Sequence, residues 1–429
     1  MKWWRKEKLE STGSVLYRGK LPPRAANFAY LEDLGIELRE APATEVAHFR
    51  LEANHARWGK AVITCLRDAP VPPDLLVDFD PRLLPAEKEL VKTAGSSVSV
   101  SLASTEGNVL RERKHLLHYL RAVMADDALA AVDHTAQAFW SRDDLDDELS
   151  HDAELDILSL FTVHALTRDD GSCFWMHTHG LSEIGHFDFD ILDPSPDLSG
   201  NPSAWDVVRA MALSVVEENA RWDGDAVEIV GGRAPIRFVP AAICRDDVGG
   251  RYDEWKKLLD PEHMARHAVA CDPGGKLLGL FRRQTRPSQW LSSPLGEDLP
   301  ILFSDGASEL MAQRARATWP VFRRAREELA GLPLPSLAKL RYETPKGQAE
   351  HLWFEVEGCT ESSVDATLVN QPWGEIGLEQ GDRRVHDLER LSDWMMLTPA
   401  GSISPRSTRL LRFVREHRSE FERALAERD

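Results

Sequence analysis

Residues 158–192 read LSLFTVHALTRDDGSCFWMHTHGLSEIGHFDFDIL, and this stretch carries the clearest structural signal of the chain. Apolar runs on both sides of Asp169 to Ser172 predict two strands, because those four residues have the composition of a hairpin turn. A symmetric closure of the turn places His164 directly opposite His177, at cross-strand contact distance. We therefore expect two imidazoles to meet on one face of a hairpin.

A third imidazole follows on the second strand. His179 comes two residues after His177, so in a continuing strand both side chains share a face. Gly180 then frees the backbone to turn and bring further polar side chains toward the rings. The groups available for that role are Glu183, His186, Asp188 and Asp190.

Three interpretations of this cluster stay open. Three imidazoles and a carboxylate are a suitable set of ligands for zinc or another first-row divalent ion. Without a metal, paired histidines can hold a phosphate or act as general acid and base, since their pKa lies near neutral pH. The third interpretation is structural, with half-buried rings bonded to backbone carbonyls. The metal interpretation makes a divalent ion such as zinc the cofactor, with the candidate ligands His164, His177, His179, Glu183 and His186.

The size and composition of the chain predict a folded protein of more than one domain. At 429 residues and 48.2 kDa the chain is longer than a domain with one ordinary hydrophobic core, and 42% of its residues are hydrophobic. It has no apolar run of the roughly 18 residues that a membrane-spanning helix needs. The opening MKWWRKEKLE lacks an apolar stretch, and the five cysteines are scattered, so neither export nor a disulfide framework is expected. We expect a cytoplasmic protein with reduced thiols.

Charge narrows the choice of partners. Lys and Arg total 52 against 70 Asp and Glu, which gives a net charge of −18. Repulsion from polyanions argues against nucleic acid or an anionic membrane as a partner. Residues 126–156 carry eleven of the acidic residues and one basic residue, Arg142. This segment suits a solvated face or a patch for a basic partner.

The spacing of hydrophobic residues predicts the strands and helices of the N-terminal part. Residues 98–102 alternate as in a strand, and residues 109–124 change to helical spacing. His115 and His118 lie among basic residues of that helix, so we expect a solvated flank there. Strands alternating with helices predict mixed sheets covered by helices, in an α+β fold.

The C-terminal part has its own apolar pattern. A helix over residues 307–329 precedes three short strands, and this spacing predicts a small curved sheet or partial barrel. Residues 285–308 lack periodicity, so we expect the chain to divide there. The predicted parts are residues 1–200 with the histidine-rich hairpin, 201–300 as its α+β continuation, 305–400 as a small α+β domain and 401–429 as a terminal helix.

Aromatic side chains predict a binding surface on the small domain. Residues 351–357 alternate, with His351 and Trp353 on the face away from the core. Tryptophan is enriched in recognition surfaces, and the chain has 13. The predicted ligand-binding residues are His351, Trp353, Trp373, Asp393 and Trp394.

The motifs EHLWFEV at 350–356, LVNQP at 368–372, Gly381-Asp382 and LSDWM at 391–395 follow one another in the C-terminal part. In this order they resemble the bacterial domain-of-unknown-function family 2314. The Gly-rich approach to the N-x-P turn in that family is replaced here by Asp365-Ala366-Thr367. Upstream, TVHAL at 162–166 and WMHTHG at 175–180 look like family 4026, which often precedes it.

The resemblance implies a bacterial protein that pairs these two families, and it implies no known reaction. Domains similar to the C-terminal one have been grouped with small interaction modules, including candidate toxin-neutralising proteins.

Two functions are compatible with these features. The first is a non-enzymatic binding protein, in which an acidic scaffold with a small aromatic-rich domain recognises a protein or a small molecule. The second is a metal- or histidine-dependent hydrolase that works at His164, His177 and His179, with Glu183 as base or fourth ligand. The sequence has no G-x-S-x-G elbow, H-E-x-x-H motif or glycine-rich phosphate loop, so the binding protein is favoured.

Overall fold

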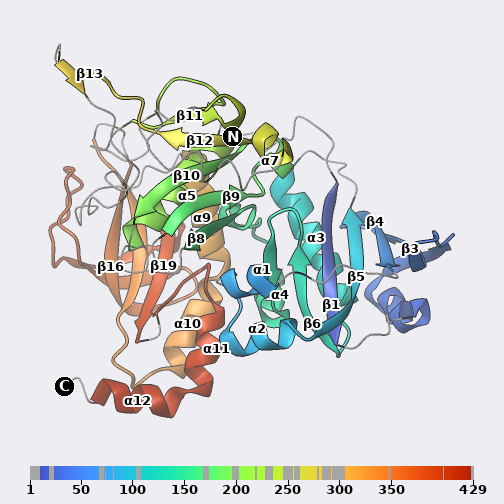
Figure 1. Ribbon diagram of the computed structural model, residues 1–429. Helices are drawn as coiled ribbons and strands as arrows, with labels where there is room; N and C mark the ends of the chain where they lie inside the picture. The colour runs from blue at the N-terminus through green and yellow to red at the C-terminus, as the bar shows by residue number, and fades with distance from the viewer. Residues whose placement is uncertain are drawn as a thin grey trace. The chain divides into compact units, whose positions relative to one another are not determined.

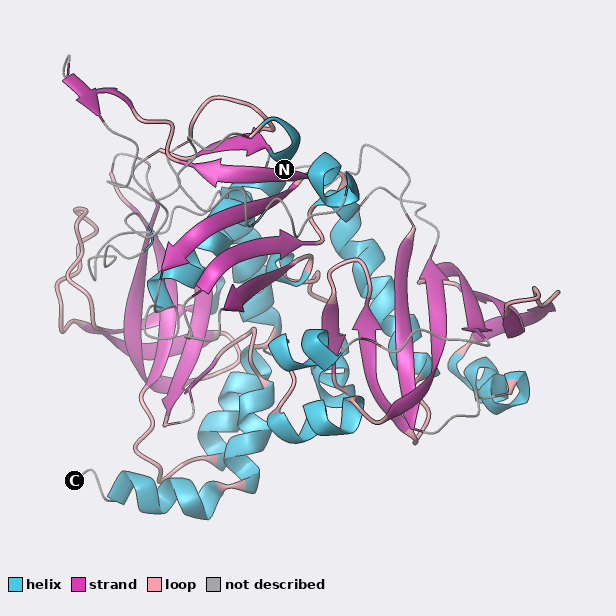
Figure 2. Ribbon diagram, viewed as in Figure 1, coloured by secondary structure: helices cyan, strands magenta, loops and turns pink. Residues whose placement is uncertain are grey.

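The computed structural model describes residues 10–18, 24–66, 72, 74–80, 82–102, 108–167, 173–195, 202–217, 220–227, 235–244, 255, 261–277, 280–282, 291, 305–345, 347, 349–399 and 401–426 (Figure 1). The chain forms two compact units, one of residues 1–145 and 157–304 and the other of residues 146–156 and 305–429. Both combine helices with sheets, which confirms the α+β class (Figure 2). The predicted turn at 169–172 and most of the predicted division at 285–308 lie outside the described residues. No helix in the described part of the chain is long and apolar enough to cross a membrane.

The first unit contains a seven-stranded antiparallel sheet in the order β2-β3-β4-β5-β1-β6-β7. Helix α3 (Val109–Val123) packs closely on β1, because a Cβ on Gly13 would lie 2.8 Å from Leu120 Cδ1. The strands are β1 (Ser11–Arg18), β2 (Ile36–Ala41), β3 (Ala47–His55), β4 (Gly59–Leu66), β5 (Ala94–Leu102), β6 (Ala128–Asp133) and β7 (Ala138–Trp140). The other helices of this part are η1 (Ala25–Leu34), α1 (Asp74–Phe79), α2 (Pro85–Val91) and α4 (Arg142–Leu149), the last of which runs on into residues of the second unit.

The histidine-rich stretch belongs to a five-stranded sheet of the first unit, in the order β11-β12-β10-β9-β8. Its neighbours are antiparallel except β10 and β12, which run parallel and bring His267 beside Asp188. Trp175, Trp255 and Val269 are buried in a core on this sheet. The strands are β8 (Thr162–Thr167), β9 (Cys173–His179), β10 (Asp188–Ser195), β11 (Arg237–Pro240) and β12 (His267–Cys271), followed by the hairpin of β13 (Gly275–Leu277) and β14 (Leu280–Arg282). The helices of this part are η2 (Ile157–Ser159), η3 (Ser182–Ile184), α5 (Pro202–Val216), η4 (Ala241–Ile243) and α7 (Pro261–Arg266).

The second unit is a six-stranded antiparallel sheet with helices, in the order β18-β17-β16-β15-β19-β20. Residues 146–156 belong to it through buried Glu148, which forms a two-bond ion pair with Arg314. The strands are β15 (Ser336–Glu343), β16 (Ala349–Cys359), β17 (Ser363–Leu368), β18 (Arg383–Asp387), β19 (Leu391–Thr398) and β20 (Gly401–Ile403). The helices are α9 (Asp305–Ala317), α10 (Trp319–Glu328), η6 (Leu388–Arg390), α11 (Arg409–Glu416) and α12 (Arg418–Ala426).

The prediction of a partial barrel is wrong. The sheet of the second unit is open, with β18 and β20 at its edges, and it does not curl strongly. One face is covered by a layer of helices, in which Trp319 and Phe322 pack against Phe354 and Trp394 of the sheet. A sheet whose apolar face is already buried by helices has no need to close on itself. Residues 401–429 were predicted as one terminal helix, but they begin with strand β20 and continue with the two helices α11 and α12, and Val414 joins the same core.

Candidate metal centre

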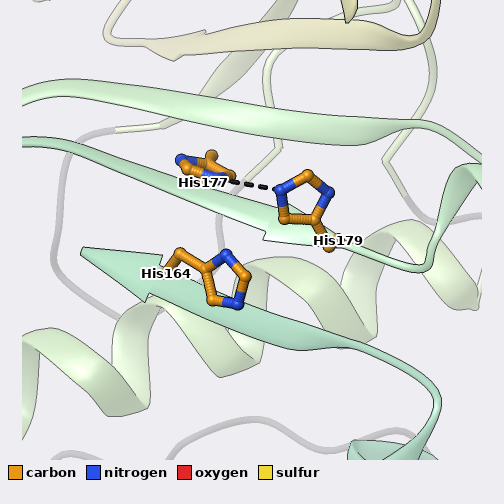
Figure 3. Close-up of side chains that lie close together, drawn as sticks. All are labelled: His164, His177 and His179. Carbon is orange, nitrogen blue, oxygen red and sulfur yellow. Dashed lines mark hydrogen bonds between the residues drawn. The ribbon is translucent and has the colours of Figure 1, made fainter. Parts of the chain in front are cut away.

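The hairpin of β8 and β9 brings the first two histidines together. His164 and His177 are direct partners in the register, as predicted, and their ring centroids are 5.4 Å apart. Both side chains are buried. Figure 3 shows their rings, with that of His179, on one side of the two strands.

His179 completes a three-imidazole cluster. Its Nε2 lies 3.0 Å from Nε2 of His177, and its ring centroid lies 5.0 Å from that of His164. One ring nitrogen from each of the three residues lies within 4.8 Å of the other two. Tetrahedral zinc with bonds of about 2.0–2.1 Å separates its ligand nitrogens by about 3.3 Å, so the widest pair has to close by at most roughly 1.5 Å. The cluster is therefore close to the size that a metal ion requires.

The surroundings of the cluster favour neutral imidazoles. Burial lowers the pKa of His177 well below its ordinary value, and the neighbouring His179 lowers it further, against an opposing effect of Asp190. Burial also lowers the pKa of His164. A metal ion binds the unprotonated ring, so rings that are neutral near pH 7 lose no proton on binding.

Two carboxylates lie beside the cluster and have different roles. Asp190 on β10 is the cross-strand neighbour of His177, is fully buried, and accepts a hydrogen bond of 2.8 Å from Trp175 Nε1. Asp188 accepts hydrogen bonds from Thr178 Oγ1 and from the backbone N–H groups of residues 181 and 182. Asp188 thus holds the turn after β9, and its oxygens are already used by donors.

A polar cavity of about 460 Å³ adjoins the cluster at His179. Its lining includes His134, whose Nε2 is 2.7 Å from Ser14 Oγ, and the buried His267. The lining consists of Glu10, Thr12, His134, Thr135, Gln137, His179, Gly180, Ser182, Glu183, Asp188, Arg266 and His267. The cavity gives the histidine cluster room for a ligand.

Two of the five predicted metal ligands are not part of the three-nitrogen cluster. Glu183 lines the cavity but forms an ion pair with Arg266, and its side chain is 40% exposed. His186 neither lines the cavity nor belongs to the cluster, and its backbone N–H donates to the carbonyl of Leu181. The structure therefore brings together three of the five predicted ligands.

Sequence reasoning missed His134 and His267 at this site. His267 reaches it through the parallel pairing of β10 with β12, which joins residues far apart in the chain. His134 reaches the cavity from the turn between β6 and β7 of the other sheet. No local sequence signal marks either approach.

The single aromatic surface predicted on the second unit is not formed. Trp394 is fully buried, packs on Phe322 with ring centroids 5.3 Å apart, and donates from Nε1 to Thr318 Oγ1. Trp353 lies on the opposite face of the sheet, where Lys339 Nζ is 5.3 Å from its ring centroid. Trp394 pairs with Ala338 and Trp353 with Lys339, and these two neighbours on β15 face opposite sides of the sheet.

The other predicted residues of this unit remain outside that core. Asp393 pairs with Lys339 and so shares a face with Trp353, and His351 Nδ1 lies 2.9 Å from Ser392 Oγ. Trp373 is 76% exposed. Its backbone N–H, together with that of Gly374, donates to the buried carboxylate of Glu350. The glutamate of the EHLW motif therefore fixes the loop that presents Trp373.

Two segments of the chain match models of protein families. Residues 306–425 match the model of DUF2314, described as an uncharacterized protein conserved in bacteria. Residues 163–241 match the C-terminal model of DUF4026, a protein of unknown function. Both resemblances expected from the sequence are confirmed. The comparisons with curated proteins and with solved structures gave no match.

The DUF4026 segment holds all three clustered histidines, whereas His267 follows it in the chain. Since neither family description names a reaction, the function has to be argued from the geometry of the site.

Proposed function

We propose that the first unit binds one first-row divalent ion, with zinc as the best fit, through His164, His177 and His179. The convergence of three ring nitrogens within 4.8 Å carries this proposal. Imidazole suits zinc and its neighbours, whereas magnesium and calcium prefer oxygen ligands. Burial lowers the pKa of His164 and of His177, which favours the neutral ring that a metal ion binds.

The same geometry supports the hydrolase hypothesis over a purely structural ion. A zinc ion with three protein ligands retains a fourth position for water or substrate, whereas structural zinc sites use four protein ligands. His179 belongs to both the cluster and the cavity, so a ligand in the cavity can reach that position. The ion would polarise such a ligand as a Lewis acid.

Partner binding by the second unit is the second candidate function. Trp373 supports it, because a tryptophan that is 76% exposed on a loop fixed by Glu350 loses little conformational freedom on binding. This surface excludes Trp394 and is smaller than the one predicted from the sequence.

Metal content and zinc-dependent stability test the proposed function together. The wild type should contain one zinc ion per chain after loading and gel filtration, and chelation should lower its melting temperature. His177→Ala combined with His179→Ala should bind no ion and show no zinc-dependent shift. His186→Ala is the matched control, from the same segment but outside the cluster, and should behave as wild type. A wild-type chain without bound zinc, or a double variant that keeps it, would contradict the proposal.

A further inference from the structure

Strand β18 forms one edge of the sheet in the second unit, with β17 as its neighbour. Four of its five residues are exposed, and the side chain of Val385 is 69% exposed. A free strand edge offers backbone N–H and C=O groups to another strand, and proteins usually cover such an edge or protect it with charges that repel a second strand. The order of the charges on β18 therefore decides whether this edge can pair.

The hydrogen bonds at both ends of β18 show which of its backbone groups point away from β17. The N–H of Leu368 donates to the carbonyl of Asp382, and the N–H of Leu388 donates to the carbonyl of Ser362. Both bonds keep the register of the strand pairing, and in an antiparallel ladder bonded and non-bonded residues alternate. The even-numbered residues of β18 are therefore bonded to β17, and the backbone groups of the odd-numbered residues face outward.

The outward residues are Arg383, Val385 and Asp387, and a second copy of β18 can pair with all three. In an antiparallel pair with two-fold symmetry centred on Val385, this residue lies opposite its own copy, and Arg383 lies opposite Asp387 of the second copy. Each of these pairs exchanges both N–H···O=C bonds, because the outward groups of the two strands face one another. The edge is therefore complementary to itself.

Charge favours this register over its neighbours. It places the guanidinium of Arg383 opposite the carboxylate of Asp387, and such cross-strand pairs stabilise a sheet. A pair centred on Arg383 or Arg384 would instead place an arginine opposite its own copy and would use fewer of the outward residues. Arg383 donates to Asp365 and to Glu357, and within the described part of the chain these bonds leave other N–H groups of its fork for a further carboxylate.

We propose that two copies of this chain associate through β18, as an antiparallel strand pair centred on Val385. The six-stranded sheets of the two copies then form one continuous sheet. The paired segment is short, so the dimer is reversible and depends on concentration. It involves no metal ion, and its test is therefore independent of the function proposed for the first unit.

Cysteine cross-linking of the full-length chain tests the register. In the symmetric pair the two Cα atoms of residue 385 are about 5.5 Å apart, which is within the range of a disulfide. Val385→Cys should therefore give a covalent dimer on mild oxidation. Arg383→Cys is the matched control on the same strand, because its own copy lies about 14 Å away. It should stay monomeric on a denaturing gel, as should the wild type with its five native cysteines.

Sedimentation equilibrium measures the association without a cross-link. With increasing concentration the mass of the wild type should rise from 48.2 kDa toward twice that value. Val385→Pro should raise the dissociation constant about 30-fold, the effect of losing two backbone hydrogen bonds. Val385→Lys should also weaken the dimer, because two positive charges then lie opposite each other. Val369→Lys adds the same charge at another exposed valine, outside β18, and should match the wild type.

Each result decides whether β18 pairs with its copy. A chain that stays monomeric at every concentration would overturn the inference and leave the edge to a strand of another protein. A wild-type dimer that Val385→Lys leaves intact would also overturn it, because the interface would then lie elsewhere. That variant keeps every backbone N–H of β18, so it tests the association even where Val385→Pro lowers the melting temperature. Equal cross-linking of Val385→Cys and Arg383→Cys, or none in Val385→Cys, would contradict the register.

Discussion

Gly180 is the residue on which the geometry of the histidine site most depends. Its φ of +114° is strained for any other residue, and an added Cβ would lie 2.5 Å from the carbonyl oxygen of Leu160. We expect Gly180→Ala to destabilise the first unit by roughly 2 kcal/mol or more. Denaturant unfolding measures this, with Gly59→Ala as the control, since Gly59 also has positive φ but no atom within 4 Å of an added Cβ. Equal losses in both variants would show that the close packing at Gly180 is unimportant.

Trp373 and Trp394 both lie in the segment that matches DUF2314, but one side chain is exposed and the other is buried. Trp394→Ala should cost about 3–5 kcal/mol of unfolding free energy, because it empties a buried site. Trp373→Ala should stay within about 0.5 kcal/mol, since that side chain is exposed. Urea unfolding of both variants tests this pair. A large loss of unfolding free energy in Trp373→Ala, or a small loss in Trp394→Ala, would contradict the assignment of Trp394 to the core and of Trp373 to the surface.

The tryptophans also show why residue-level predictions failed in the second unit. Alternation along one strand correctly placed Trp353 on the outer face, since Lys339 is its partner there. Grouping it with Trp394 went against the same alternation, because Asp393 pairs with Lys339 while the next residue, Trp394, pairs with Ala338 on the buried face. Adjacent residues of a strand point to opposite faces, so Asp393 and Trp394 do not share a surface.

At the level of elements, the hairpin of β8 and β9 was predictable because its contacts are local. A short turn between two apolar runs was enough to pair His164 with His177, even though the register shifts between Leu166 and Thr167 near that turn. The parallel neighbour β12 was not predictable, because its partner β10 is separated from it by residues 196–266. The histidine cluster was therefore foreseen, and the cavity beside it was not.

Helix α3 is more deeply packed than its basic sequence predicted. Arg113 is fully buried and forms an ion pair with Asp133. His118 stacks on Trp58 with ring centroids 4.6 Å apart, and His55 stacks on the same indole. The expected solvated flank is instead a contact between α3 and the turn that joins β3 to β4.

This stack predicts a pH dependence of stability. Burial, followed by nearby positive groups, lowers the pKa of His118 from 6.5 to about 4. In the unfolded chain the ring takes up a proton as pH falls through about 6.5, whereas in the folded chain it stays neutral down to about 4. The stability that the neutral ring contributes is therefore present above about pH 6.5 and is lost on acidification, by roughly 1 kcal/mol at pH 5, because the ring is only half-buried and solvent screens part of the effect. Unfolding of wild type and His118→Gln at pH 8 and pH 5 should show a smaller loss in the variant, and equal losses would contradict this origin.

The second unit includes a short segment that lies, in the sequence, between the two parts of the first unit. Residues 146–156 belong with residues 305–429, and Arg314 holds them through its buried ion pair with Glu148. Limited proteolysis should first cut within 285–308, which stays a prediction. The two fragments should then remain associated on gel filtration, because the second unit includes residues of the N-terminal fragment.

Breaking that ion pair should release the fragments. Arg314→Ala leaves Glu148 buried without its partner, at a cost of roughly 3–5 kcal/mol. Arg384→Ala is the matched control, since its ion pair with Asp382 is exposed. Early cuts within residues 98–132, or fragments that separate without any substitution, would show that this division of the chain is wrong.

Zinc-edge X-ray absorption of the zinc-loaded wild-type protein tests the three-histidine site, because it reports the atoms bound to the ion. An ion held by His164, His177 and His179 should show three imidazole nitrogens and one oxygen at about 2.0–2.1 Å. This signal should be absent from the variant combining His177→Ala and His179→Ala. A shell of oxygens with one imidazole or none, or any sulfur ligand, would place the ion elsewhere and contradict a metal centre built on His164, His177 and His179.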